Sequence, residues 1–343
     1  MTTGNPILQL FGRDLQVMPE RLRDRWTNRA FCYWRRQGFP FPSLTPHEIE
    51  SQFNMLMGAC PTAILHNGTA KASMIGLSLA NSFHPQMWSV TKRGRSPIEC
   101  FLDNSVLRKC LKKAFQFWPH RRCWNAQCIR SLIRIYHRGR VSNFRPTVAR
   151  AIAASYSGRG ATVLDFTAGY GGRMLGCLTL DRHYIGIDAE RAQVRGLRRL
   201  GKAVRAVAPG TYEIHQGCAE VVLKDIPSDS VDLVLTSPPY FNNEEYSRSS
   251  FQSYRRYPIY EVWRDRFLRP VITQSRRILR RGGRLVLNVA DTGSHPVASD
   301  VRQIALEGFV LERTIKLLLN RMPLQRAKAV PLYRWEPIFV FVK

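Results

Sequence analysis

The sequence is short of acidic residues and has no long apolar run. No apolar stretch reaches the roughly 18 residues that a membrane-spanning helix needs, and the first residues show no signal-peptide pattern. The eight cysteines are scattered and form no Cys-x-x-Cys pair, which disfavours a zinc site and a disulfide framework. These absences predict a cytoplasmic protein with reduced thiols, no membrane association and no bound metal.

The net charge of the chain is strongly positive. The 343 residues include 52 Lys and Arg but only 25 Asp and Glu, a formal net charge of +27. Such an excess favours a polyanionic partner, and nucleic acid is the leading candidate because each neutralised phosphate releases counterions. A ribosome-like or membrane-surface role is the alternative. Arginine makes up most of the excess, which suits forked contacts to phosphate and stacking on bases.

The chain changes character near residue 139. Residues 1–138 show short helical stretches and few strand signals, with Thr45 and Pro46 opening one helix and further helices expected at 105–117 and 126–136. Arginine and aromatic residues alternate there in a way that suits nucleic-acid contact and target recognition. The alternative is a solvated basic surface. The residues concerned are Arg93, Arg95, Arg121, Arg122, Arg138 and Arg140, beside Trp88 and Trp124.

Residues 139–343 alternate between strands and helices. The predicted strands are 161–165, 183–188, 211–216, 231–236 and 284–289, followed by a terminal pair at 309–318 and 338–342. The predicted helices are 171–180, 189–204 and 261–279. This order predicts an α/β fold with an open, mostly parallel, Rossmann-like sheet covered by helices on both faces. Ligands of such sheets bind at the carboxyl ends of the strands.

Three polar signals follow the first three of these strands. Asp165 precedes a turn containing Gly169 and Gly171, but the third glycine of a dinucleotide fingerprint is replaced by Met174. Asp188 ends the second strand, where an acid can accept both hydroxyls of a ribose or cap the next helix. The stretch from Gly217 to Glu220 follows the third strand, where contacts to an adenine ring are expected.

The fourth strand is followed by Ser237-Pro238-Pro239-Tyr240. Two prolines cannot continue a ladder or a helix interior, so they predict a rigid, extended exit with free backbone carbonyls. A rigid pair of acceptors beside an aromatic face suits a planar group that carries an NH2, such as a nucleobase. The alternative is a proline-stiffened loop with a packed tyrosine.

In this order, the motifs resemble those of the S-adenosyl-methionine-dependent amino-methyltransferases of DNA. The family's cofactor motif D-P-F-x-G-x-G corresponds to Asp165 through Gly171, with Phe166 for Pro and Thr167 for Phe. Its catalytic motif [D/N/S]-P-P-[Y/F/W] corresponds to residues 237–240, and Val141 through Thr147 resembles its N-terminal cofactor motif. The resemblance implies S-adenosyl-L-methionine as cofactor, held by Phe144, Arg145, Pro146, Asp165, Thr167, Gly169, Gly171, Asp188, Cys218 and Glu220.

The resemblance also implies a reaction. Ser237 and the Pro238 carbonyl would accept hydrogen bonds from an exocyclic amine, Pro239 would keep the motif rigid, and Tyr240 would stack on a flipped base. The base is adenine or cytosine, because the serine form of the motif occurs with both. The expected setting is a restriction–modification system, a phage or a stand-alone modifier. The alternatives are an RNA base amino-methyltransferase and a non-catalytic nucleic-acid-binding protein that retains the fold.

A long polar and aromatic stretch follows Tyr240. It predicts a loop that faces the substrate; a plain surface insertion is the alternative. The predicted substrate contacts are Phe241, Asn242, Tyr246, Tyr254 and Arg255.

Overall fold

The computed structural model describes residues 18–91, 94–117, 124–136, 143–243, 245–247, 249–320 and 333–343. The chain divides into two compact units, and each of them is made of two separate stretches. Unit 1 comprises residues 1–43 and 85–142, and unit 2 comprises 44–84 and 143–343. Residues 44–84 therefore belong with the α/β part of the chain, although they precede the predicted boundary at 138. Of the predicted basic contacts, Arg93, Arg121, Arg122, Arg138 and Arg140 lie outside the described residues.

Unit 1 is helical in the part that the structure describes. Its elements are α1 (Glu20–Gln37), η2 (Pro85–Ser89), α5 (Pro97–Leu102), α6 (Asn104–Phe117) and α7 (Ala126–Tyr136). They enclose their own apolar cluster, which includes Trp34, Phe101, Leu111, Trp124 and Ile129. The Trp124 indole donates to the Leu111 carbonyl at 3.1 Å, so the ring is buried with its N–H satisfied. The predicted helices 105–117 and 126–136 are confirmed within a residue.

Unit 2 carries the sheet. Its strands are β1 (Leu65–His66), β2 (Thr69–Lys71), β3 (Thr162–Asp165), β4 (His183–Asp188), β5 (Thr211–Gln216), β6 (Val231–Thr236), β7 (Leu279–Asn288), β8 (Val310–Asn320) and β9 (Tyr333–Val342). Its helices are α2 (Pro46–Met57), α3 (Pro61–Ile64), α4 (Leu77–Ser82), α8 (Pro146–Tyr156), α9 (Gly172–Leu178), α10 (Arg191–Val204), α11 (Ala219–Val222), η3 (Leu223–Asp225), α12 (Ser253–Arg256), α13 (Tyr260–Trp263), η4 (Arg264–Leu268), α14 (Arg269–Ile278) and α15 (Val297–Leu306).

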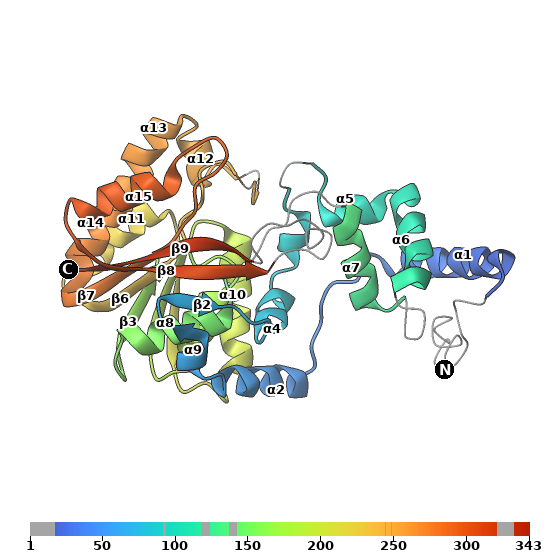
Figure 1. Cartoon of the computed structure of the whole chain (residues 1–343), viewed down its shortest axis with the longest axis horizontal. Coiled ribbons are helices and arrows are strands. Elements are labelled where there is room, and N and C mark those ends of the chain that lie inside the picture. The colour runs from blue at the N-terminus through green and yellow to red at the C-terminus, as the bar shows by residue number, and fades with distance from the viewer. Residues whose placement is uncertain are drawn as a thin grey trace. The chain divides into compact units, whose positions relative to one another are not determined.

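The described strands form one sheet in the order β1-β2-β8-β9-β7-β6-β3-β4-β5. The run from β7 to β5 is parallel, whereas β9 is antiparallel to both of its neighbours. Successive residues face opposite sides, so that Val163 and Leu233 join one core cluster and Leu164 and Val234 the other. Helices α8, α9 and α10 cover the first face, and α11, α14 and α15 the second (Figure 1). The predicted α/β class with a mostly parallel sheet is confirmed.

Two strands of the sheet come from the segment that the sequence predicts as helical. Asn67 and Gly68 have φ of 46° and 69°, the pair of positive values that an Asn-Gly hairpin turn requires. The turn brings β2 beside β1, and β2 then pairs in parallel with β8 from Lys316 to Leu318. Helix α2 precedes them and begins as predicted, because Thr45 caps it with a reciprocal Glu48 contact and Pro46 stands in its first turn. Residues 44–84 thus complete the sheet and one of its faces.

The predicted long helix at 261–279 is interrupted. It consists of α13, a π-helical turn (η4) and α14, and it ends at Ile278, where β7 begins. Pro270 explains the interruption, because it cannot donate to the carbonyl four residues earlier and its ring displaces that carbonyl. The four strands predicted between residues 161 and 236 are confirmed, three of them at their predicted bounds.

Candidate active site

The carboxyl ends of β3, β4, β5 and β6 meet at one edge of the sheet because these strands are parallel neighbours. Asp165, Asp188, Gln216 and Thr236 are their last residues. Asp165 lies opposite Gly186, and Asp188 opposite Gln216, so the segments that follow these strands leave the sheet side by side. The structure therefore brings together the glycine turn, the predicted ribose acid, the Cys218 segment and the Ser237 motif.

Asp165 is held by other side chains of the chain rather than open to solvent. It is fully buried and forms an ion pair with Arg173, with 2.7 Å between Nε and Oδ2. The hydroxyls of Tyr184 and Thr236 donate to its two oxygens at 2.8 and 2.7 Å. Burial raises the pKa of Tyr184 well above its usual range, so the phenol remains a neutral donor. These contacts compensate the cost of burying the carboxylate and fix the end of β3.

Thr167 connects this network to the Ser237 motif. Its Oγ1 lies 2.7 Å from Thr236 Oγ1 and donates to the backbone carbonyl of Ser237 at 3.0 Å. The Thr236 proton is used on Asp165, so the single Thr167 proton is shared between Thr236 and the Ser237 carbonyl. A phenylalanine, which the family motif has at this position, would offer no such donor. The backbone of Ser237 is therefore held by Thr167, a position at which this chain differs from the family motif.

The glycine turn requires glycine at several positions. Gly169 and Gly171 have φ of 57° and 75°. A Cβ on Gly171 would lie 2.6 Å from a Leu200 methyl, whereas one on Gly169 would meet only the Thr167 carbonyl at 3.7 Å. The backbone at Gly169 is thus open to close approach by a ligand. Pro at 166 is absent here, and Phe166 is instead a buried core residue.

The segment that resembles the N-terminal cofactor motif lies against this turn. Asn143 donates to the Tyr170 carbonyl and to Asn81 Oδ1, both at 2.9 Å. A Cβ on Gly172 would stand 2.0 Å from the Phe144 carbonyl, so the two backbones are in direct contact. Arg145 is the N-cap residue of α8 and Pro146 its buried first residue. Val141 and Ser142 lie outside the described residues.

Asp188 is oriented by two backbone N–H groups. Gly169 donates to its Oδ2 and Glu190 to its Oδ1, each at 2.9 Å. Loss of hydration on burial raises the pKa of this carboxyl to about 7, although the two N–H groups act in the opposite direction. Asp188 therefore closes the glycine turn at the carboxyl end of β4.

Glu220 and Cys218 contact the segment that follows the tetrapeptide. Glu220 is 7% exposed, and its Oε1 lies 3.4 Å from both Arg256 Nη1 and the Tyr257 hydroxyl. Burial raises the pKa of the Cys218 thiol, which keeps it neutral. Both residues were predicted as cofactor contacts. In the structure, Glu220 contacts the end of α12, and the Cys218 thiol lies 3.8 Å from the Phe251 carbonyl just before that helix.

Phe241 is buried, in contrast to the substrate-facing position predicted for it. It is 4% exposed and its ring lies edge-on to Tyr260 and His295, with centroids 5.4 and 5.1 Å apart. Its φ of 55° is unusual for a bulky residue and turns the chain sharply after Tyr240. Asn242, next in the chain, is exposed. The structure thus assigns Phe241 to the core and leaves Asn242 accessible at the edge.

The other predicted substrate residues belong to one tethered loop. Tyr246 is half-buried, with its ring centroid 6.3 Å from that of Tyr170 in the glycine turn. Ser247 donates to Glu190 Oε2 at 2.5 Å, which links the loop to the end of β4. The exposed Arg255 donates to the Tyr254 hydroxyl at 3.2 Å and lies over the Tyr254 ring. The loop is thus held next to the glycine turn, with Arg255 left accessible.

The sequence reasoning did not single out several residues that build the site. Arg173, Tyr184 and Thr236 complete the Asp165 network, and Glu190 anchors the loop. Arg173 had a signal: a basic residue in an otherwise apolar and glycine-rich helix, eight residues after Asp165. Tyr184 had none, because a tyrosine in a strand is ordinary.

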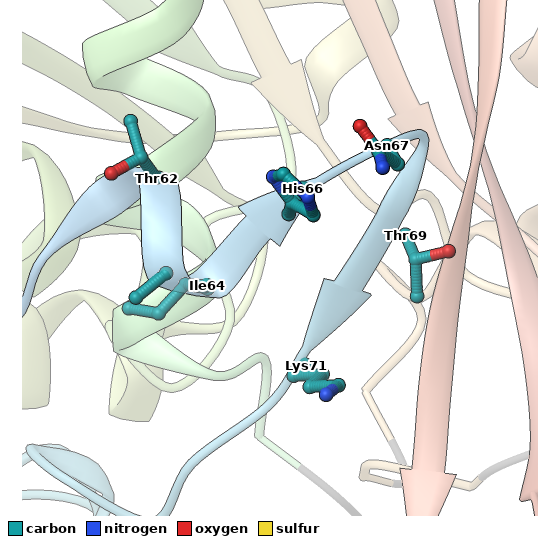
Figure 2. Close-up of a pocket in the computed structure, with 7 residues that line it drawn as sticks. Thr62, Ile64, His66, Asn67, Thr69 and Lys71 are labelled. Atoms are coloured by element: carbon teal, nitrogen blue, oxygen red, sulfur yellow. The ribbon is translucent and has the colours of Figure 1, made fainter.

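A separate hollow lies beside β1 and β2, at the end of the strand order away from β3, β4 and β5. It has a volume of about 730 Å³ and is lined by residues of α3, β1 and β2, including His66, Thr69 and Lys71 (Figure 2). Strands β8, β9 and β7 separate β2 from β6, so the hollow is not part of the candidate active site. Among the described residues no cluster of His, Cys, Asp and Glu can hold a metal ion. None of the helices in the described parts is long and apolar enough to span a membrane.

Sequence comparison agrees with this geometry. A family model described as DNA methylase matches residues 231–343, which include β6 and the Ser237 motif. Residues 231–343 are thus similar to the DNA methylase family. The type II methyltransferase M.MjaVI of Methanocaldococcus jannaschii is 34% identical over 96 residues, which cover 26% of this chain and 46% of the relative. The chain thus spans about half the length of that relative. The resemblance to the amino-methyltransferases of DNA is confirmed, and S-adenosyl-L-methionine is the methyl donor of this family.

Similar solved structures were also found. TrmN from Thermus thermophilus has a TM-score of 0.40 and 17% identity, over 58% of this chain and 49% of its own. A precorrin 8w decarboxylase from Methanobacterium thermoautotrophicum has a TM-score of 0.41 and 15% identity, over 59% and 92%. The assignment rests on the sequence matches and on the site, not on these likenesses.

Proposed function

We propose that this protein transfers a methyl group from S-adenosyl-L-methionine to the exocyclic amine of adenine or cytosine in DNA. The observation that carries the proposal is the Ser237-Pro238-Pro239-Tyr240 motif, which leaves β6 at the sheet edge shared with the glycine turn and Asp188. The DNA methylase match over the same residues supports DNA as the substrate. The RNA alternative has no specific observation in its favour, and neither has a non-catalytic role.

The residues at the sheet edge suit the cofactor. The open backbone at Gly169 lets a ligand approach closely, and the oriented Asp188 carboxylate can accept the hydroxyls of a ribose. Cys218 and Glu220 follow β5, where the adenine ring would lie, and Phe144 to Pro146 flank the glycine turn on its other side. When bound, S-adenosyl-L-methionine supplies a methyl group on a sulfonium, an electrophile that needs no nucleophilic residue of the enzyme.

The contribution of the chain to the reaction is positioning. An exocyclic amine is a poor nucleophile because its lone pair is conjugated with the ring. Hydrogen bonds from the NH2 to the Ser237 hydroxyl and the Pro238 carbonyl would orient the nitrogen and favour transfer along one line. Thr167 assists as a positioning residue, because its bond to the Ser237 carbonyl fixes the orientation of the adjoining peptide. The half-buried Tyr240 offers a ring on which a flipped base can stack.

The test is methyl transfer by Ser237→Ala and Tyr240→Ala. Incubation with duplex DNA and labelled cofactor, followed by digestion to nucleosides and mass analysis, identifies the modified base. Each variant is expected to lose at least about tenfold in turnover, the equivalent of about 1.4 kcal/mol of transition-state stabilisation, with little change in cofactor affinity. Unchanged turnover in both variants would contradict the catalytic assignment. Transfer to structured RNA but not to duplex DNA would favour the RNA alternative.

A further inference from the structure

Helix α1 of unit 1 carries four exposed arginines on one face. Arg21, Arg25, Arg29 and Arg36 are all exposed, and their spacing of four, four and seven residues places them within an arc of about 80°. We call this set the arginine stripe. The buried residues Thr27, Ala30 and Trp34 lie on the opposite side of the helix, so the stripe points directly away from the core of unit 1.

The stripe contains no acidic residue. The two acids of α1 are Asp24 and Glu20, which lie about 100° and about 140° to one side of the stripe's centre. Asp24 already forms an ion pair with Lys112 of α6 at 2.8 Å. Arg21 with Arg25, and Arg25 with Arg29, are like charges one turn apart, an arrangement that destabilises a helix on its own. A solvated surface helix usually mixes signs, so this arrangement indicates an anionic partner.

The geometry suits a phosphate backbone. The stripe extends about 22 Å along the helix, and neighbours one turn apart are separated by about 6 Å. Charges on one strand of duplex DNA recur about every 3.4 Å along the axis, so about six phosphates span the same length. The guanidinium of Arg29 lies 4.8 Å from the centre of the Trp26 ring, which restricts its freedom before binding. No large apolar side chain of α1 is exposed, which argues against insertion into a membrane.

We infer that the arginine stripe of α1 binds the phosphate backbone of duplex DNA. The choice of DNA over RNA rests on the proposed function; the anionic character of the partner does not. The stripe contributes affinity that does not depend on base sequence, because phosphate contacts position a protein without reading bases.

The experiment measures binding of a fluorescent DNA duplex by anisotropy at several salt concentrations. One variant changes all four stripe arginines to glutamine. A charge-matched control makes the same change at four other exposed residues: Arg195, Arg199 and Lys202 of α10, and Arg205, the C-cap residue of that helix. Each phosphate contact contributes about 0.9 to the slope of log affinity against log salt, so the stripe variant is expected to lose about 3 to 4 from that slope. The α10 control and a variant with lysine at all four stripe positions are expected to retain it.

Two results would overturn the inference. The slope of the stripe variant could equal that of the unchanged protein, or the α10 control could lose as much. A third, altered binding of an RNA duplex with unaltered binding of DNA, would overturn the choice of DNA. Circular dichroism monitors folding, and if the quadruple variant unfolds, the four single substitutions are expected to lower the slope by about 0.9 each. The binding measurement does not depend on methyl transfer. If the stripe variant lowers the slope but the unchanged protein transfers no methyl group to DNA, the proposed function is contradicted and the inference about the stripe is not.

Discussion

Thr167, which replaces the phenylalanine of the family motif, makes hydrogen bonds that a phenylalanine could not make. Its hydroxyl reaches the Ser237 carbonyl at 3.0 Å while its neighbour Thr236 is bound to the buried Asp165. The donor therefore lies between a rigid anchor and the residue that would orient the amine. A residue in this place acts on catalysis only through another residue, which gives it a distinctive kinetic signature.

Replacement of Thr167 by valine keeps the shape of the side chain and removes the hydroxyl. We expect turnover to fall by roughly 3- to 10-fold, which corresponds to the usual net contribution of one hydrogen bond. The KM for the cofactor should change little. Thr167→Ser is the matched control and should restore turnover, because it keeps the donor. Equal turnover in the valine and serine variants at a temperature where both are folded would show that the hydroxyl has only a structural role.

The raised pKa of Asp188 predicts that cofactor binding depends on pH. Its pKa of about 7 means that the carboxylate that would accept ribose hydroxyls is largely protonated at pH 6 and largely ionised at pH 8. Binding of S-adenosyl-L-methionine should therefore tighten as the pH rises through this range, as measured by calorimetry. Asp188→Asn should bind more weakly and show a flatter profile. The same pH dependence in the asparagine variant would assign the titration to another group.

Most elements and the edge that carries the site were predictable because their signals are local. An apolar run that ends in Asp165 or Asp188 identifies both a strand and its carboxyl end, and parallel order then gathers the ends at one edge. The Asp165 network was not predictable, since the partnership of Arg173, Tyr184 and Thr236 depends on the alignment of three strands and a helix. Burial of Phe241 was missed for the same reason: its aromatic partners come from α13 and the segment before α15.

Strand β2 was missed for a different reason. The Asn67-Gly68 turn is a sequence signal for a hairpin, but its strands are only two and three residues long. Such strands are stable only through their partner, and the partner of β2 is β8, near the other end of the chain. The hairpin signal at Asn67-Gly68 therefore did not indicate that residues 44–84 belong to the sheet.

At the scale of the whole molecule, the discontinuous units predict which truncation will fold. A chain that begins at residue 139 lacks β1, β2 and α2, including Phe53 and Leu56, which are fully buried in the core. We expect it to be insoluble or to unfold at a much lower temperature, because removal of each such side chain typically costs several kcal/mol. Thermal unfolding followed by circular dichroism is the measurement.

The matched truncation keeps residues 44–84 and joins them to 143–343 by a short glycine–serine linker. The hydrogen bond of 2.9 Å between Asn81 and Asn143 shows that the two ends lie close together. This protein should unfold cooperatively and bind S-adenosyl-L-methionine, since unit 2 retains its sheet and both core clusters. Equal stability of the two truncated proteins would contradict the assignment of residues 44–84 to unit 2.

The pairing of β2 with β8 also bears on the order of events during synthesis. Thr69 must pair with Lys316, which follows 247 residues later. At about 5–20 residues per second, a ribosome needs roughly 12–50 s to make that stretch. Throughout this interval the edge of β2 has no partner, while unit 1, whose described residues all precede residue 137, is already outside the ribosome. The nascent chain therefore completes its basic helical unit first and the sheet of unit 2 last, when β9 fills the gap between β7 and β8.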